Sequence, residues 1–419
     1  MHNPLSLKPR WLISIIPYKL VMAIMSTLII LYVIDVGGRA EEVSITVATL
    51  TLGGLIGSLL WSYLINRAKN KLGFYLLGYL GLIFPSLILY LSQDFLLILI
   101  SAFFFSFVTA STYFAGLFMI SKTKRGMNRM IGRFEEVGGW AWVAGLVLGT
   151  LLTSFLDSRT IFLILGIFSL LSILLIVPSL ERKLLVKFKE KIKEEELGLL
   201  PMVERGVEFI LKEEELVVHH FFRGLGAVVK GPLSLTHPIV KIGLPKTHIY
   251  FHLSFLLLFI SFGLVSSQII NFQKQNGLSD SLVFMFSLLS SVVAAIFYSK
   301  ASKTKNLEKT LKCMYALRGL MFLVVGIPFL LFYPFIYFLF FTFFLIDGFT
   351  WAYILILSNS NILRVAKEEI GLNNFFRSIG FIIGSFLAGI VVSSLGFFTN
   401  FLMASIIVFI VALAFRKMR

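Results

Sequence analysis

The chain has 419 residues, of which 58% are hydrophobic and 14% are charged, whereas soluble proteins average roughly 25% charged residues. This composition excludes an ordinary soluble domain. The net charge of +16 does not indicate nucleic-acid binding, because the basic residues form short clusters between apolar runs rather than a basic stripe with interleaved aromatic residues.

The apolar runs predict twelve membrane-spanning helices, because about 20 predominantly apolar residues cross a bilayer. In the first half the expected spans are 11–34, 43–65, 73–92, 95–120, 134–156 and 160–180. In the second half they are 248–271, 281–299, 311–332, 334–358, 370–395 and 397–415. The first run continues to Ile34 without a small-residue cleavage site, so we expect a retained span rather than a signal peptide.

A charged connector at 181–245 separates the two halves. Apolar residues at helical spacing over 181–215 predict one or two amphipathic helices on the cytoplasmic surface. Glycine, proline and β-branched residues over 216–245 indicate a hairpin or an irregular strap. The predicted organisation is an N-terminal six-helix bundle at 1–180, the connector at 181–245, and a C-terminal six-helix bundle at 246–419.

Loop charges give the orientation of the expected spans. Basic residues are concentrated in alternate loops, at 67–71, 122–133, 300–312 and 416–419, whereas the intervening loops carry acidic residues or mixed charge. Because cytoplasmic loops carry an excess of lysine and arginine, this alternation places both termini in the cytoplasm. We expect a multi-pass protein of the plasma membrane.

The two halves repeat a sequence pattern. The segment RFEEVGGWAWVAGLVLGTLLTS in the fifth expected span is echoed by NNFFRSIGFIIGSFLAGIVVSS in the eleventh. Small residues along one face allow helices to pack closely in lipid. Many transporters built from such repeats bind their substrate at the interface between the repeats.

The twelve expected spans, cytoplasmic termini, long central loop and paired halves resemble the major facilitator superfamily. The basic loop of that family, G-x-L-x-D-R-x-G-R-K, is matched in part by SYLINRAKNK. Leu64, Arg67 and Lys71 agree with it, whereas Asn66 replaces the aspartate and Lys69 the glycine. The resemblance implies secondary transport of a small solute by alternating access, with a proton or sodium ion as a candidate co-substrate. The antiporter pattern of the fifth span lacks its proline, so that subgroup is not implied.

Asp347 is the leading candidate site residue. It lies about 13 residues into the tenth expected span, near the middle of the membrane, where a charge costs at least roughly 2.5–3.5 kcal/mol on insertion scales. Thr350 and Trp351 share its helical face, and the resemblance implies that the first, fourth, seventh and tenth spans line the cavity. Asp347 is therefore either a substrate or proton site, or one half of a structural ion pair with Arg318 or Arg377.

Other charged residues leave two interpretations open. Lys19, Arg318 and Arg377 could extend to the interface or pair with neighbouring helices, although an inward-facing Lys19 would suit an anionic substrate group. Adjacent glutamates begin the fifth span, and they could couple transport to protons or be neutralised by nearby arginines and the helix N-terminus. The candidate coupling or gating residues are Glu135, Glu136, Arg67, Arg377 and Arg318.

Polar residues on the fourth and seventh spans could serve as hydrogen bonds between helices or line a small cavity. The pairs that share a face are Thr109 with Thr112 and Ser261 with Gln268. No cofactor or metal is expected, since His248 and His252 alone make a weak metal site. No phosphate-binding loop or nucleophile motif indicates an enzyme. The alternative to transport is a membrane scaffold or sensor that binds partners through the connector.

Overall fold

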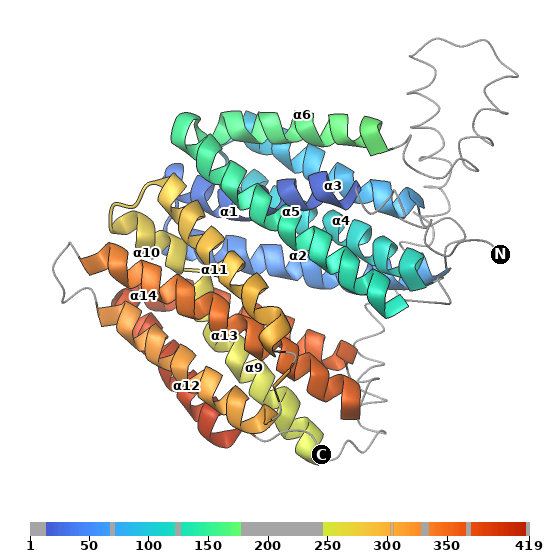
Figure 1. Ribbon diagram of the computed structural model, residues 1–419. Coiled ribbons are helices and arrows are strands. Elements are labelled where there is room, and N and C mark those ends of the chain that lie inside the picture. Colours follow the sequence, from blue (N-terminus) through green and yellow to red (C-terminus); the bar gives the residue numbers. More distant parts are fainter. Residues whose placement is uncertain are drawn as a thin grey trace, which may run out of the picture.

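The structure, a computed structural model, describes residues 14–67, 72–121, 127–176, 246–301, 303–304, 306–327, 335–365 and 370–415. Its regular elements in these ranges are α-helices (Figure 1). A first helix group comprises α1 (Ile15–Asp35), α2 (Ala40–Arg67), α3 (Leu72–Leu91), α4 (Phe95–Ser121), α5 (Met127–Phe155) and α6 (Ser158–Ile176). A second helix group comprises α9 (Lys246–Ser266), α10 (Ile269–Gln275), α11 (Asp280–Ala301), α12 (Leu307–Gly326), α13 (Phe335–Val365) and α14 (Ile370–Ala414).

These helices match a membrane environment. Within the described residues, nine helices are long and apolar enough to cross a bilayer. Many large apolar side chains on their outer surfaces are exposed, among them Leu171, Phe338 and Ile410. Such extensive apolar exposure is abnormal in water but matches contact with lipid tails. The prediction of an all-helical membrane protein is therefore confirmed.

The helices of each group pack mainly with one another. In the first group α1 contacts α5 and α6, α2 contacts α4, and α3 contacts α4 and α6. In the second group α9 contacts α14, α11 contacts α13, and α12 contacts both α13 and α14. The two groups meet along two seams, in which α2 packs on α14 and α5 packs on α11 (Figure 1).

Glycines make the closest helix contacts, and the repeated segments use them in the same way. A Cβ atom added at Gly145 of α5 would lie 2.5 Å from the backbone oxygen of Leu20 in α1. Gly380 and Gly384 of α14 press in the same manner against the backbone of α9, at Leu256 and Ile260. Small residues at corresponding places thus bring α5 onto α1 and α14 onto α9.

One expected span is broken in the structure, and two others are assigned together as one helix. The helix expected at 248–271 is broken, because α9 ends at Ser266 and α10 begins at Ile269. At the break, the side chain of Gln268 forms hydrogen bonds with α2. The helix assigned as α14 loses helical geometry at Gly396, where φ is +82°, a conformation that glycine adopts readily. This break lies between the expected spans 370–395 and 397–415.

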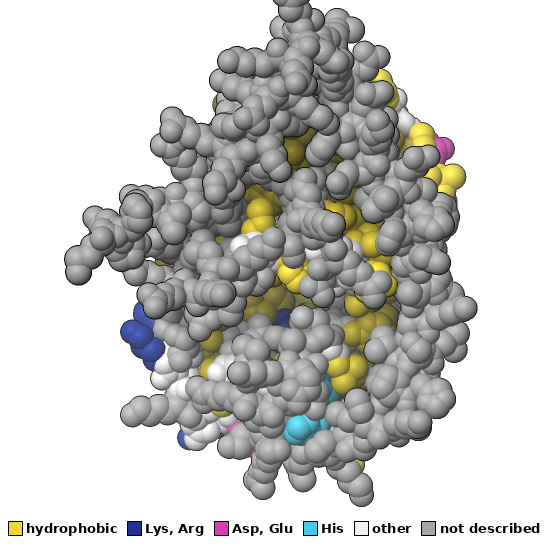
Figure 2. All heavy atoms as spheres, turned by 90° about the vertical axis from the view of Figure 1, so that its right-hand side faces the viewer, with side chains coloured by type: hydrophobic (Ala, Val, Ile, Leu, Met, Phe, Trp, Pro, Cys, Tyr) yellow, Lys and Arg dark blue, Asp and Glu magenta, His cyan; other side chains and the backbone are white. Residues whose placement is uncertain are grey.

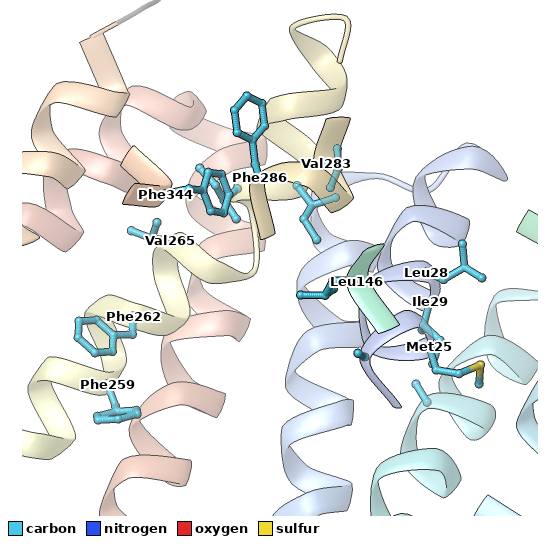
Figure 3. Packing of buried hydrophobic residues seen from close by; sticks show 14 of the residues in the cluster. Met25, Leu28, Ile29, Leu146, Phe259, Phe262, Val265, Val283, Phe286 and Phe344 are labelled. Carbon is cyan, nitrogen blue, oxygen red and sulfur yellow. The ribbon is translucent and has the colours of Figure 1, made fainter. Parts of the chain in front are cut away.

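Buried apolar side chains from both groups form the core. Figure 3 shows Met25, Leu28 and Ile29 of α1 on one side and Phe259 and Phe262 of α9 on the other. The predicted amphipathic helices and strap of the connector at 181–245 lie outside the described residues, as do both chain ends.

Candidate functional site

Asp347 of α13, with 23% of its side chain exposed, forms an ion pair with the buried Arg318 of α12. Arg318 also donates through Nη1 to Thr350 Oγ1 at 3.2 Å. The second carboxylate oxygen of Asp347 accepts a hydrogen bond from Ser290 Oγ of α11 at 2.7 Å. Both oxygens of Asp347 are therefore used within the second helix group. Of the two interpretations left open by the sequence, the contacts support the structural ion pair.

Aromatic rings surround the guanidinium of Arg318. Its Cζ atom lies 4.2 Å from the ring centroid of Phe262, 5.6 Å from that of Phe322 and 5.8 Å from that of Trp351. A cation over an aromatic face is attracted by the ring quadrupole, more strongly when water is excluded. Trp351 therefore lies beside both the Arg318–Asp347 ion pair and the aromatic side chains of α9.

Lys19 points toward α4 and α5. Its Nζ lies 5.3 Å from the ring centroid of Tyr113, and a Cβ added at Gly138 would lie 3.5 Å from its Cε. The Tyr113 hydroxyl donates to Glu135 Oε1 at 2.7 Å, and Glu135 acts electrostatically on Lys19. Lys19 thus lies beside an aromatic ring of α4 that is bonded to a carboxylate of α5.

A chain of contacts continues from this cluster into the second group. Helix α5, which carries Glu135, packs on α11, which carries Tyr298, and α11 packs on α13, which carries Trp351. The Trp351 ring lies 6.2 Å from that of Phe259, over which Arg377 Cζ lies at 4.7 Å. We refer to these linked residues as the central arc: Lys19, Tyr113, Glu135, Tyr298, Trp351, Phe259 and Arg377.

Arg377 is nearly buried, with 8% of its surface exposed. Its Nη1 donates to Asn359 Oδ1 of α13 at 3.2 Å. Asp347 is paired with Arg318, and no carboxylate of the described residues forms a salt bridge with Arg377. Of the two partners predicted for Asp347, the structure therefore has Arg318 and not Arg377.

The four polar candidates Thr109, Thr112, Ser261 and Gln268 bond to groups other than Asp347. Thr109 Oγ1 donates to the carbonyl of Phe105 in its own helix at 2.5 Å, and Thr112 Oγ1 donates to the carbonyl of Tyr75 in α3 at 2.8 Å. Ser261 Oγ donates to the carbonyl of Ala404 in α14 at 2.8 Å. Thr112 and Ser261 thus bond between helices, as in the first of the two interpretations given above, whereas Thr109 bonds within its own helix.

Gln268, the fourth of these candidates, joins the two helix groups instead. Its Nε2 donates to the carbonyl of Ala40 at 2.8 Å and to Ser44 Oγ at 2.6 Å, both in α2. Beside it, Lys274 of α10 contacts Asp280 of α11 at 2.6 Å and Asp35 of α1 at 4.0 Å. Asp35 also accepts from Ser158 Oγ at 2.8 Å. We call this network the clamp: Asp35, Ser44, Ser158, Gln268, Lys274 and Asp280.

The clamp and the central arc lie at different depths. Lys19 and Asp35 are 16 residues apart in α1, which corresponds to about 24 Å along a helix. The end of the molecule opposite to α10 is shown in Figure 2, where hydrophobic side chains, with a basic side chain among them, lie set back in the middle of the face. Between described residues, the hydrogen bonds and ion pairs that join the two groups lie at the clamp end.

The remaining candidates contribute less to this arrangement. Glu136 is exposed. Arg67 is the last residue of α2, and its side chain is outside the described part of the chain. In the described ranges, no cluster of three or more His, Cys, Asp and Glu residues could hold a metal ion. His252 instead stacks on Phe376 and lies 3.3 Å from Asn373.

Tyr298, Phe259 and the clamp residues other than Gln268 were not among the predicted site residues. Tyr298 lies beside a basic loop, where its sequence context indicates only an interfacial position. Phe259 is one of 44 phenylalanines, and its sequence context does not distinguish it from the others. Lys274 and Asp280 could have been found from the sequence, because opposite charges at the ends of neighbouring expected spans can form an ion pair.

Comparison with known proteins agrees with this architecture. The sequence profile of the Major Facilitator Superfamily matches residues 11–373. No curated protein sequence matches the chain. An auto-inhibited POT family peptide transporter has a similar structure, with a TM-score of 0.70 and 12% identity over 97% of this chain and 95% of that one. Tetrameric PepTSo2 has a TM-score of 0.65 and 11% identity over 97% of this chain and 94% of that one. At these identities the structural likeness concerns the fold.

Proposed function

Because this chain belongs to the Major Facilitator Superfamily, we propose that it carries a small solute across the plasma membrane by alternating access. In this proposal twelve spans form two six-helix bundles, at 1–180 and 246–419, and both termini lie in the cytoplasm. Alternating access requires the bundles to rock around a site between them. Membership of this family makes the chain a transporter rather than an enzyme.

The uneven distribution of contacts between the two helix groups carries this proposal. Between described residues, Gln268 bonds to α2 and Lys274 pairs with Asp35 at one end of the molecule. The central arc lies toward the opposite end, beyond those contacts. A transporter closed on one side has such an arrangement: a polar seal on that side and a binding site accessible from the other. The loop charges assign the sealed side to the outside.

The central arc is the proposed binding and coupling site. Its charged ends belong to different bundles, with Lys19 and Glu135 in the first and Arg377 in the second. A solute that touches both ends therefore contacts groups that move relative to each other when the bundles rock. Trp351 and Phe259 provide an apolar surface between these ends, and Glu135 is the proposed proton carrier because its carboxylate binds the hydroxyl of Tyr113, whose ring lies beside Lys19.

Transport by purified protein in proteoliposomes tests the proposed function. The assay screens organic acids, amino acids, peptides and sugars for saturable uptake. We expect uptake of at least one class, driven by a proton gradient. Liposomes without protein give the background, and uptake no faster than that background for every class would contradict transport and favour the scaffold or sensor alternative.

Substitution Glu135→Gln tests the coupling role. The amide keeps the hydrogen bond from Tyr113 but cannot carry a proton, so we expect exchange across the membrane to continue while gradient-driven accumulation is lost. Glu308→Gln is the matched control, because Glu308 pairs with Lys312 on α12, 3.3 Å away and outside the arc. Accumulation by Glu135→Gln equal to that by the control would assign the coupling to another group.

A further inference from the structure

We infer that the transported solute carries an oxyanion, a carboxylate or a phosphate, and that Arg377 of α14 and Tyr315 of α12 bind it together. This inference rests on the proposed function and specifies the substrate class of the same site. It depends on two buried polar groups whose bonding capacity is not used by the described residues.

The first group is the guanidinium of Arg377. A guanidinium has five N–H donors and no acceptor, and within the described residues one hydrogen bond uses them, from Nη1 to Asn359 Oδ1 at 3.2 Å. Phe259 covers one face of the ion at 4.7 Å. The planar arrangement of the remaining donors matches the two oxygens of a carboxylate or phosphate.

The second group is the hydroxyl of Tyr315. This residue is fully buried, with 0% of its surface exposed, and its hydroxyl has no hydrogen-bond partner within the described part of the chain. A buried polar group left unpaired is unfavourable. Tyr315 lies on α12, which packs on α14, the helix of Arg377. One oxyanion between them would accept hydrogen bonds from both groups.

The other buried arginine of the described residues already has a carboxylate partner, which sets Arg377 apart. Arg318 pairs with Asp347. A buried charge without a counterion is strongly unfavourable, so a membrane-embedded arginine paired only with an amide is suited to an anion supplied from outside the chain. Among the described residues, Arg377 is the buried arginine in this condition.

The position of Arg377 connects this anion site to the central arc. Phe259 contacts Arg377 on one side and Trp351 on the other, so an oxyanion bound at Arg377 would place the rest of the solute beside these two rings. Glu135 and Tyr113, joined by a hydrogen bond, belong to the other end of the central arc. The arrangement suits an organic anion with an apolar body, whose charged end is held by the second helix group.

Binding to the purified full-length chain in detergent tests this inference independently of transport. Four probes share one ring and differ in charge: benzoate, phenyl phosphate, benzyl alcohol and benzylamine. We expect one or both anions to raise the melting temperature and to bind saturably by calorimetry, and the neutral and cationic probes to do neither. Equal binding of benzyl alcohol or benzylamine, or no binding of either anion, would overturn the inference.

Substitutions locate the anion. Arg377→Gln should weaken anion binding by roughly tenfold or more, because hydrogen bonds to charged groups contribute about 1.5–3 kcal/mol. Arg377→Lys keeps the charge and should retain part of the affinity, which also controls for folding. Tyr315→Phe removes one donor and should weaken binding several-fold. Lys312→Gln, on the partly exposed face of α12, should bind like the unmodified chain. Unchanged anion affinity in Arg377→Gln would overturn the assignment.

The outcomes for binding and for transport are separable. Saturable uptake of a neutral or cationic solute that Arg377→Gln leaves intact would contradict the oxyanion site but not the transport function. Anion binding that depends on Arg377, without uptake of any anion into proteoliposomes, would contradict transport but not the site.

Discussion

Asp347 pairs with Arg318, and we expect this pair to stabilise the second helix group. Replacing Asp347 with Asn would leave the guanidinium of Arg318 buried without a counterion, which typically costs about 3–5 kcal/mol. We therefore expect Asp347→Asn to lower the melting temperature strongly in detergent. The double variant Arg318→Met with Asp347→Leu removes both charges and should recover most of the stability.

A coupling role for Asp347 predicts the opposite result. In that case Asp347→Asn would fold as stably as the unmodified chain and would lose gradient-driven accumulation in proteoliposomes. The two measurements together therefore distinguish the structural role from the coupling role.

The depth of Asp347 could be predicted from the sequence, but its partner could not. Arg318 and Arg377 both lie in spans that could contact the tenth span, and the spacing along the chain gives no distance between helices. Ser290 was also unpredictable, because a serine in an apolar span more often bonds to its own helix. The pairings in the central arc depend on side chains from seven helices, which no local pattern specifies.

At the scale of helices, close packing of α5 on α1 depends on Gly145. A methyl group at this position would lie 2.5 Å from the Leu20 carbonyl oxygen and 2.9 Å from Ala23 Cβ, so Gly145→Ala should push the helices apart and lower the melting temperature. Gly139→Ala in the same helix is the matched control, because nothing lies within 4 Å of its added Cβ.

The control should be neutral or slightly stabilising, since alanine favours a helix over glycine by about 1 kcal/mol. Equal melting temperatures for the two variants would show that the contact at Gly145 is not tight.

The helix ranges were largely predictable because membrane length and loop charge restrict them. The expected span 95–120, for example, corresponds to α4 at Phe95–Ser121. The break between α9 and α10 was not predictable, because hydrophobicity continues through Ile269 and Ile270 and the side-chain bond of Gln268 at the break is to a distant helix. The break at Gly396 has a local cause, the positive φ of the glycine itself, and the expected spans 370–395 and 397–415 predicted a boundary at this residue.

For the whole molecule, the clamp should control which side of the transporter is open. Each hydrogen bond of Gln268 contributes about 0.5–1.5 kcal/mol, so Gln268→Ala should shift the population toward a state open at the clamp end by several-fold. We propose to measure this shift with Val43→Cys, a buried position in α2, in a Cys313→Ser background.

A membrane-impermeant thiol reagent should label Val43→Cys several-fold faster when Gln268→Ala is added. Lys300→Gln, distant from the clamp on α11, serves as the control substitution. If Gln268→Ala and Lys300→Gln give the same labelling rate, the clamp does not hold this side closed.

The chemistry of the clamp has a consequence for the medium around the protein. Lys274 and Asp35 are only partly buried, with 23% and 33% of their side-chain surface exposed, and their charged atoms lie 4.0 Å apart. Partly exposed ion pairs weaken as salt increases, because the Debye length falls from about 10 Å at 0.1 M to about 3 Å at 1 M. Salinity on the clamp side would then set the resting ratio of the two conformations, so that the same protein would spend more time open toward a briny medium than toward a dilute one.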